Sequence, residues 1–142
     1  SKLTAVSARR DAAHAELKRV ESRSTELALV MKHAATYRQL KPLYDRYRKS
    51  GDKEKFLRGH ESEIILFEAA ARELKRLGAV PLPATESTKT ELANLAAEKE
   101  RLFAEYKAAR SEVQEYETVK QNVDALIAVP KEQEQQRRHE LE

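Results

Sequence analysis

Basic and aromatic side chains alternate through one stretch of this sequence, PLYDRYRKSGDKEKFLRGH at positions 42–60. Lysine and arginine neutralise phosphates, and aromatic rings stack on bases, so this composition is typical of a surface that follows a nucleic-acid backbone. Residues 38–58 hold eight basic and three acidic side chains, whereas the whole chain has a net charge of only +3. We predict that the eight form a positive surface for DNA, the basic elbow: Arg38, Lys41, Arg46, Arg48, Lys49, Lys53, Lys55 and Arg58.

The aromatic residues of this stretch also support a second interpretation, in which it is a joint between two helices. Tyr44 and Tyr47 share one side of a predicted helix, and Phe56 follows in the next. We predict that these three side chains are largely buried where the second helix turns back on the first, with the basic residues around them in solvent. From the sequence it stays open whether the basic residues bind DNA or form only a solvated turn.

No other pattern in the chain points to a reaction or to a metal ion. The four histidines are scattered, and the nearest approach to a metal motif is His60 with Glu63, one pair that falls short of any zinc ligand set. The sequence has no cysteine, and we find no serine nucleophile elbow and no phosphate-cradling glycine loop. We therefore predict no catalytic residue, metal site, cofactor or small-molecule substrate, and this chain alone is not expected to be an enzyme.

The composition favours a chain that is helical almost throughout. Charged residues make up 36% of it and hydrophobic residues 40%, with three glycines and four prolines, which is typical of long helices and coiled coils. No run approaches the roughly 18 apolar residues that a membrane span needs, so no membrane partner is expected. A chain without cysteine suits a reducing compartment, and we expect a bacterial cytoplasm.

A first long helix is predicted over about residues 3–49, because apolar residues recur there every three or four positions. Pro42 lies inside this pattern. Since proline removes a backbone hydrogen bond and crowds the preceding turn, we expect a kink near Gln39–Lys41, or a break at which Pro42 opens a second helical piece.

A second helix is predicted over about residues 53–77. Ser50-Gly51-Asp52 should end the first helix and cap the second, and Gly78 should end the second. Residues 79–84, AVPLPA, then form an extended connector to a third helix.

The third predicted helix, over about residues 86–128, carries the most regular pattern in the sequence. Its inward-facing positions are spaced alternately by three and four residues: Leu92, Leu95, Lys99, Leu102, Tyr106, Ala109, Val113, Tyr116, Lys120, Val123 and Ile127. Such heptads indicate a coiled-coil seam. Val129-Pro130 should end or bend this helix, and residues 130–142 form a polar tail for which a helix is an open alternative.

These elements predict an all-α fold. We expect residues 1–129 to form an elongated antiparallel hairpin or coiled coil of two long helices, with the middle helix packed at one end. The seam of the third helix is then buried either against the first helix or against a second chain. The sequence does not choose between these two arrangements.

Four blocks of the sequence, in this order and spacing, carry a resemblance to a known family. They are Tyr44-x-x-Tyr47-Arg48-Lys49-Ser50-Gly51, Phe56-x-x-x-His60-Glu61-x-Glu63-Ile64, Glu105-Tyr106-x-x-Ala109-Arg110-x-Glu112 and Lys120-x-Asn122-Val123-Asp124-x-Leu126. The resemblance covers roughly residues 30–127. They resemble the helical region downstream of the nuclease domain in relaxases, the mobilization proteins of conjugative and mobilizable elements from Gram-positive gut bacteria.

The resemblance implies a parent protein that nicks one DNA strand through a tyrosine nucleophile and a histidine-bound metal. Neither part can be placed on this chain, which lacks the paired-histidine motif and whose tyrosines do not match the family's catalytic position. The implied function is a non-catalytic accessory domain that acts during conjugative transfer, with DNA at the basic elbow, other proteins of the transfer machinery and a second copy of itself as its expected partners. The alternative is a purely structural coiled-coil spacer or dimerization module with no DNA role.

Overall fold

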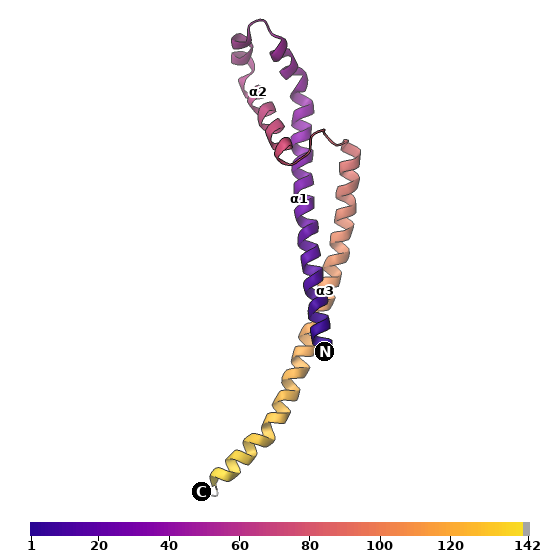
Figure 1. Cartoon of the computed structure of the whole chain (residues 1–142), viewed down its shortest axis with the longest axis vertical. Helices are drawn as coiled ribbons and strands as arrows, with labels where there is room; N and C mark the ends of the chain where they lie inside the picture. The colour runs from indigo at the N-terminus through magenta and orange to yellow at the C-terminus, as the bar shows by residue number, and fades with distance from the viewer. Residues whose placement is uncertain (141–142) are drawn as a thin grey trace. The chain divides into compact units, whose positions relative to one another are not determined.

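A computed structural model describes the backbone of residues 1–140 and the side chains of residues 1–128. Its elements are α1 (Lys2–Lys49), α2 (Lys53–Arg76) and α3 (Thr85–Glu140), labelled in Figure 1. The described residues contain no β-strand, so the predicted all-α class is confirmed. Contacts divide the chain into two compact units: unit 1 contains Ser1–Lys18 and Glu100–Glu142, and unit 2 contains Arg19–Lys99.

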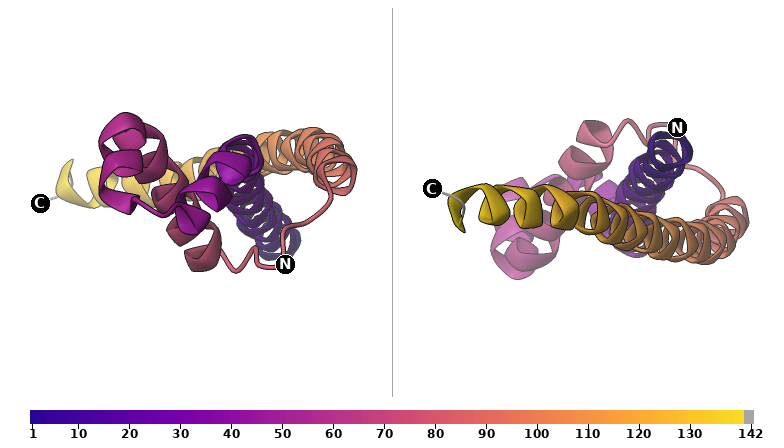
Figure 2. Two further views of the ribbon diagram at one scale, coloured as in Figure 1. Left: turned by 90° about the horizontal axis from the view of Figure 1, so that it is seen from above. Right: turned by 90° about the horizontal axis from the view of Figure 1, so that it is seen from below.

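Unit 2 forms where α2 folds back beside the second half of α1 (Figures 1 and 2). The buried side chains of α2 recur every three or four residues and so share one face: Ile64, Phe67, Ala70 and Leu74. In the apolar cluster near the end of α2, Leu74 lies with Val30 and Ala34 of α1. Partly buried side chains surround this cluster, namely Tyr37, Leu77, Ala79 and Leu82. Packing on α1 therefore holds α2 in place.

α1 runs through Pro42 without interruption, so the break considered at this proline is wrong. A proline in a helix interior costs about 3 kcal/mol, because it removes a backbone hydrogen bond and crowds the preceding turn. Packing on α2 opposes this cost. Tyr37 and Tyr44, on either side of the proline, both stack on the Phe67 ring, with ring centroids 4.7 and 4.3 Å away. One shared ring thus holds both sides of Pro42 in a single helix.

Specific residues cap both ends of α2. Asp52 is the N-cap, and its carboxylate accepts a hydrogen bond of 3.1 Å from the backbone N–H of Lys55. Past the other end, Gly78 has a φ of 69°, a left-handed conformation that glycine adopts without strain. This conformation lets the N–H of Ala79 donate to the carbonyl of Leu74, at 2.9 Å, which closes the last turn.

Replacing the N-cap by alanine (Asp52→Ala) is expected to lower the free energy of unfolding by about 1 kcal/mol, because the Lys55 N–H loses its acceptor. Asp52→Asn keeps an oxygen acceptor at the same place and should cost much less. Urea unfolding followed by circular dichroism measures both variants. If Asp52→Ala is as stable as the parent chain, the capping bond does not contribute.

α2 is kinked at His60, whose φ of −137° and ψ of 28° are not helical. The sequence predicted an uninterrupted helix over residues 53–77 and missed this kink. Gly59 is the signal that could have revealed it, since glycine inside a helix is about 1 kcal/mol less favourable than alanine. The kink separates the basic first turns of α2 from the buried face that begins at Ile64.

Unit 1 consists of the first turns of α1 and the larger part of α3. Its buried side chains are apolar and come from both helices: Val6, Ala13 and Leu17 from α1, and Leu102, Ala109 and Val113 from α3. The His14 and Tyr106 rings lie 5.5 Å apart between their centroids, and Arg9 pairs with Glu112. In unit 1 the predicted seam of α3 therefore packs against α1 from Leu102 to Val113, with Tyr106 half-buried between them.

α3 does not end at Val129-Pro130, where the sequence predicted an end or a bend, but continues to Glu140. A proline at position 130 leaves the carbonyl four residues earlier, at Leu126, without its helical donor. Leu126 is exposed, so water can take the place of that donor. The predicted polar tail is thus helical as far as Glu140, and residues 141–142 lie outside the described part of the chain.

Candidate functional site

The basic elbow lies where α1 ends and α2 begins, and all eight of its residues are exposed. The last turn of α1 contributes Arg46, Arg48 and Lys49. The first turns of α2 contribute Lys53, Lys55 and Arg58. The short segment 50–52 between the helices brings these two groups together at one end of unit 2.

Three of the eight residues are engaged within unit 2. Arg38 donates to the Thr85 hydroxyl at 2.9 Å and to the Pro83 carbonyl at 2.7 Å, so it ties α1 to the start of α3. Lys41 pairs with Asp45 at 3.3 Å, one helical turn away. The guanidinium carbon of Arg46 lies 5.7 Å from the centre of the Phe56 ring, within the range of a cation–π contact. These three therefore have structural roles that the sequence did not reveal.

The other five, which we call the free cations, form no side-chain ion pair or hydrogen bond within the described part of the chain. They are Arg48, Lys49, Lys53, Lys55 and Arg58. Two neighbouring carboxylates are already occupied, since Asp45 pairs with Lys41 and Asp52 caps α2. A cluster of positive charge is left facing solvent at the turn.

The joint aromatics Tyr44, Tyr47 and Phe56 are half-buried where α1 meets α2. Their rings form a continuous row, with centroids 5.8 Å apart for Tyr44 and Tyr47 and 6.0 Å apart for Tyr47 and Phe56. The row continues to His60, whose ring lies 4.6 Å from that of Phe56. Two helices cover only one side of such a row, so its outer edge stays in solvent.

Phe67 is the residue of this joint that the sequence analysis did not single out. It is buried, and it stacks on both Tyr37 and Tyr44. Its place in the apolar stripe of α2 indicated burial, but nothing in the sequence indicated which rings it would meet. The joint is therefore centred further along α2 than Phe56.

His60 and Glu63 approach each other as their spacing suggested, with 3.7 Å between His60 Nδ1 and Glu63 Oε2. This nitrogen is buried and has no hydrogen-bond partner among the described atoms. The described residues contain no group of three or more side chains suited to hold a metal ion. His60 instead contributes to the joint, through its contact with the Phe56 ring.

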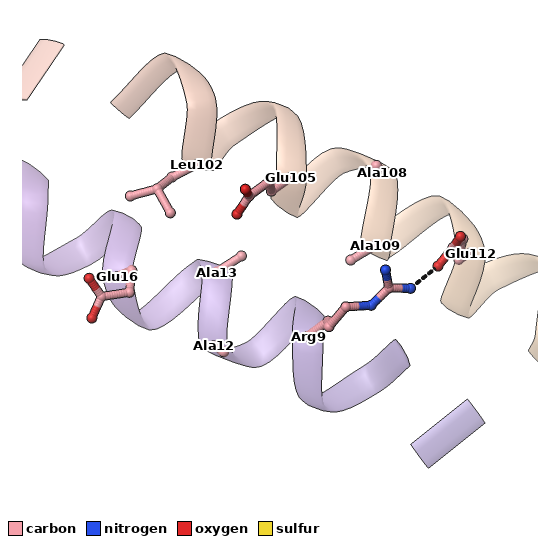
Figure 3. Close-up of a pocket in the computed structure, with 9 residues that line it drawn as sticks. All are labelled: Arg9, Ala12, Ala13, Glu16, Leu102, Glu105, Ala108, Ala109 and Glu112. Carbon is pink, nitrogen blue, oxygen red and sulfur yellow. Dashed lines mark hydrogen bonds and ion pairs between the residues drawn. The ribbon is translucent and has the colours of Figure 1, made fainter. Parts of the chain in front are cut away.

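A groove with charged walls lies between α1 and α3 in unit 1 (Figure 3). It is lined by small and acidic residues together with one leucine and one arginine: Arg9, Ala12, Ala13, Glu16, Leu102, Glu105, Ala108, Ala109 and Glu112. Figure 3 shows Arg9 pointing across the groove to its partner Glu112. Alanines on both walls let the two helices approach closely, and no nucleophile or histidine lines the groove. We read it as a helix–helix contact.

Ion pairs link α1 to α3 in unit 2. Arg23 donates to Glu91 at 3.1 Å, and this hydrogen bond, supported by the charges of Glu91 and Glu26, raises the pKa of the Arg23 guanidinium. Lys99 lies 3.6 Å from Glu21. All of these side chains are substantially exposed, so each pair contributes little stability, about 0–1 kcal/mol.

A further pair lies on the surface of α2. Arg76 donates two hydrogen bonds to one oxygen of Glu73, at 2.9 and 2.7 Å, and these bonds lower the pKa of the Glu73 carboxyl. A lowered pKa in the folded state means that the pair stabilises the fold at neutral pH and that this contribution is lost as the pH falls through that pKa. Because the groups are exposed, the pair supports α2 only weakly.

Comparison with known proteins assigns no family to this chain. No protein-family model matches it, and neither a curated protein nor a solved structure matches it. Among the described residues, no helix is both long enough and apolar enough to cross a membrane. The function is therefore argued from the side chains and their geometry.

Proposed function

We propose that this chain is a non-catalytic helical interaction domain that contacts the phosphate backbone of DNA through the basic elbow. The observation that carries the proposal is the cluster of five free cations at one turn of unit 2, all exposed and unpaired within the described residues. Phosphates that approach this cluster release their condensed counterions, which favours binding. Lysine and arginine side chains in this cluster would contact phosphates, which are the same at every base pair. We therefore expect binding without sequence preference.

The position of these cations relative to the helix ends is hard to explain by fold stability. Arg48 and Lys49 lie at the negative end of the α1 dipole and stabilise it. Lys53 and Lys55 lie in the first turns of α2, at the positive end of its dipole, where basic residues are unfavourable. A bound polyanion removes that conflict, since helix N-termini and lysines both attract phosphates. Asp52 and Glu54 at the same end of α2 offset part of this cost, and the two lysines there favour a ligand role over a solvated turn.

The parent protein that we propose is a relaxase of a conjugative or mobilizable element, on the strength of the four sequence blocks that resemble that family. In this context the domain acts in the bacterial cytoplasm as an accessory part, and strand nicking takes place elsewhere in the parent. Other proteins of the transfer machinery are further partners of such a domain. The basic elbow then helps to hold DNA while the catalytic part acts.

The arrangement that we propose for the long helices is an antiparallel hairpin with coiled-coil packing. In unit 1, contacts run from Arg9 with Glu112 to His14 with Tyr106, so the residue number rises along α1 as it falls along α3. In unit 2, the same order holds from Arg19 with Glu98 to Arg38 with Thr85. The heptad spacing of α3 supports this arrangement.

DNA binding by the elbow is tested with a charge-reversed variant and a matched control. The test variant replaces two arginines and two lysines among the free cations by glutamate: Arg48, Lys53, Lys55 and Arg58. The control makes the same charge change at exposed positions away from the elbow: Lys18, Lys32, Arg101 and Arg110. Fluorescence anisotropy with two labelled duplexes of unrelated sequence measures the affinity of each protein.

The unmodified chain should bind both duplexes equally. The logarithm of its association constant should fall linearly with the logarithm of the salt concentration, with a slope of about −0.9 for each phosphate contacted. The elbow variant should lose at least about tenfold in affinity, while the control keeps most of it. Equal losses in the two variants would show that only the net charge matters. If the unmodified chain does not bind DNA at low salt, the proposal is excluded.

A structural role without DNA is the second candidate function, and one observation favours it. The apolar face of α3 beyond Val113 is exposed, as expected of a spacer or dimerization module whose partner helix is absent. The anisotropy experiment separates the two functions, since a spacer predicts no DNA binding.

A further inference from the structure

The apolar face of α3 continues beyond the part of the helix that α1 covers. Val113 is buried in unit 1, whereas every described side chain from residue 114 to residue 128 is exposed. Figure 1 shows no other described segment of unit 1 beside this part of α3. Its large apolar residues, which we call the α3 face, are Tyr116, Val119, Val123, Leu126 and Ile127. Leu126 is 72% exposed.

The α3 face continues the interface that α1 and α3 already form. Tyr116, Val123 and Ile127 keep the three-and-four spacing of the buried Leu102, Ala109 and Val113 without a slip. A surface that extends a heptad register accepts another helix, with its side chains fitting between those of the partner. In addition, a helix with no tertiary contact is marginal in water, so a partner helix explains why this stretch is helical. The occupant is therefore a helix with heptad spacing.

We propose that the α3 face binds the same face of a second copy of this chain, with the two helices antiparallel. A two-fold axis then passes beside Gln121 and Asn122, and every contact occurs twice. The inner pairs are Tyr116 with Ile127 of the second copy and Lys120 with Val123 of the second copy. Along one flank, Val119 meets Leu126 of the second copy, so the whole α3 face is covered.

Lys120 decides the orientation of the pair. In a parallel pair of equal register, Lys120 would face Lys120 of the second copy across the seam, and two like charges would meet. In the antiparallel pair, Lys120 lies beside Val123 of the second copy and reaches Asp124 of the second copy, so opposite charges meet. Lys120 therefore favours the antiparallel pair over a parallel pair of equal register. This inference goes beyond DNA binding and does not depend on it, because the free cations belong to unit 2 and the α3 face to unit 1.

Sedimentation equilibrium of the full chain over a range of concentrations tests the association. The unmodified chain should show a monomer–dimer equilibrium. Val123→Glu with Ile127→Glu places unpaired charges in the proposed interface and should weaken association roughly tenfold or more. The control, Ile65→Glu with Leu66→Glu, also replaces two exposed apolar residues by glutamate, but on α2, and should associate like the unmodified chain. Circular dichroism of each variant checks that the helices are intact.

A charge swap tests the orientation. Lys120→Asp alone should weaken association, because the new carboxylate meets Asp124 of the second copy. Adding Asp124→Lys should restore it, since the opposite charges then meet again in the reversed order. A parallel pair predicts no such rescue, because residues 120 and 124 are not neighbours across a parallel seam.

Three outcomes would overturn the inference: a monomer at every concentration, unchanged association of the variant with Val123→Glu and Ile127→Glu, or no rescue by the charge swap. The chain could also be a monomer in which the amides of residues 119–127 resist hydrogen exchange. Another segment of the same chain would then occupy the α3 face, and this result would overturn the inference too. A monomer that binds DNA would refute this inference alone and leave the proposed function standing.

Discussion

Replacing Phe67 by alanine is expected to lower the free energy of unfolding of unit 2 by about 3–5 kcal/mol. Phe67 is 5% exposed, and its ring stacks on both Tyr37 and Tyr44. The substitution removes the buried ring and both stacking contacts and leaves a cavity between α1 and α2. Because small domains are stable by only about 5–15 kcal/mol, this loss is a large fraction of the total.

The Phe67→Ala variant should also affect α1 around Pro42. Since Tyr37 and Tyr44 hold the helix across the proline by stacking on Phe67, loss of that ring should let the helix open there. Native-state hydrogen exchange should show faster exchange over residues 38–46 than in the parent chain. Equilibrium urea unfolding gives the overall stability.

Phe103→Ala serves as the matched control, because Phe103 is 49% exposed on α3 and lies in unit 1. Its removal should cost far less than that of Phe67 and should leave exchange near Pro42 unchanged. If Phe67→Ala unfolds no more easily than Phe103→Ala, the aromatic joint does not hold unit 2 together. Intact protection around Pro42 in Phe67→Ala would show that the helix crosses the proline without help from α2.

The second large effect is expected at Leu74, which is 1% exposed in the apolar cluster with Val30 and Ala34. Leu74→Ala should lower the free energy of unfolding by about 2–5 kcal/mol, because it removes buried methyl groups and leaves a cavity that its neighbours fill only in part. Urea unfolding measures this loss, and hydrogen exchange of the α2 amides locates it in unit 2. Exchange resolved by residue is needed because two units need not unfold as one.

Leu66→Ala is the matched control, with the same residue type on the same helix but 55% exposed. It should change stability by no more than about 0.5 kcal/mol. A difference between the two leucines therefore reports burial and not helix propensity, since both substitutions make the same change in an α2 helix. Similar losses at Leu66 and Leu74 would mean that α2 does not pack on α1 as described.

The existence of the helices could be predicted from the sequence because its causes are local. Apolar residues at steps of three and four need only the helical period to share a face, and Asp52 and Gly78 act on backbone groups a few residues away. The exposure of the basic elbow followed in the same way, since charged side chains around a short turn stay in water. These features require no knowledge of a partner.

The remaining features depend on groups that are distant in the sequence, so only the tertiary structure decided them. The helix through Pro42 depends on Phe67 of another helix, and the half-burial of Tyr44 and Tyr47 depends on how much of them α2 covers. Which basic residues are free depends on partners such as Thr85, which holds Arg38 across 47 positions of the chain. The seam of α3 shows the division most clearly: its heptads run without a slip from Leu92 to Ile127, yet burial ends at Val113. A periodic pattern specifies which face of a helix needs a partner. The length over which a partner covers that face is decided only in the folded chain, because burial requires atoms from a second element.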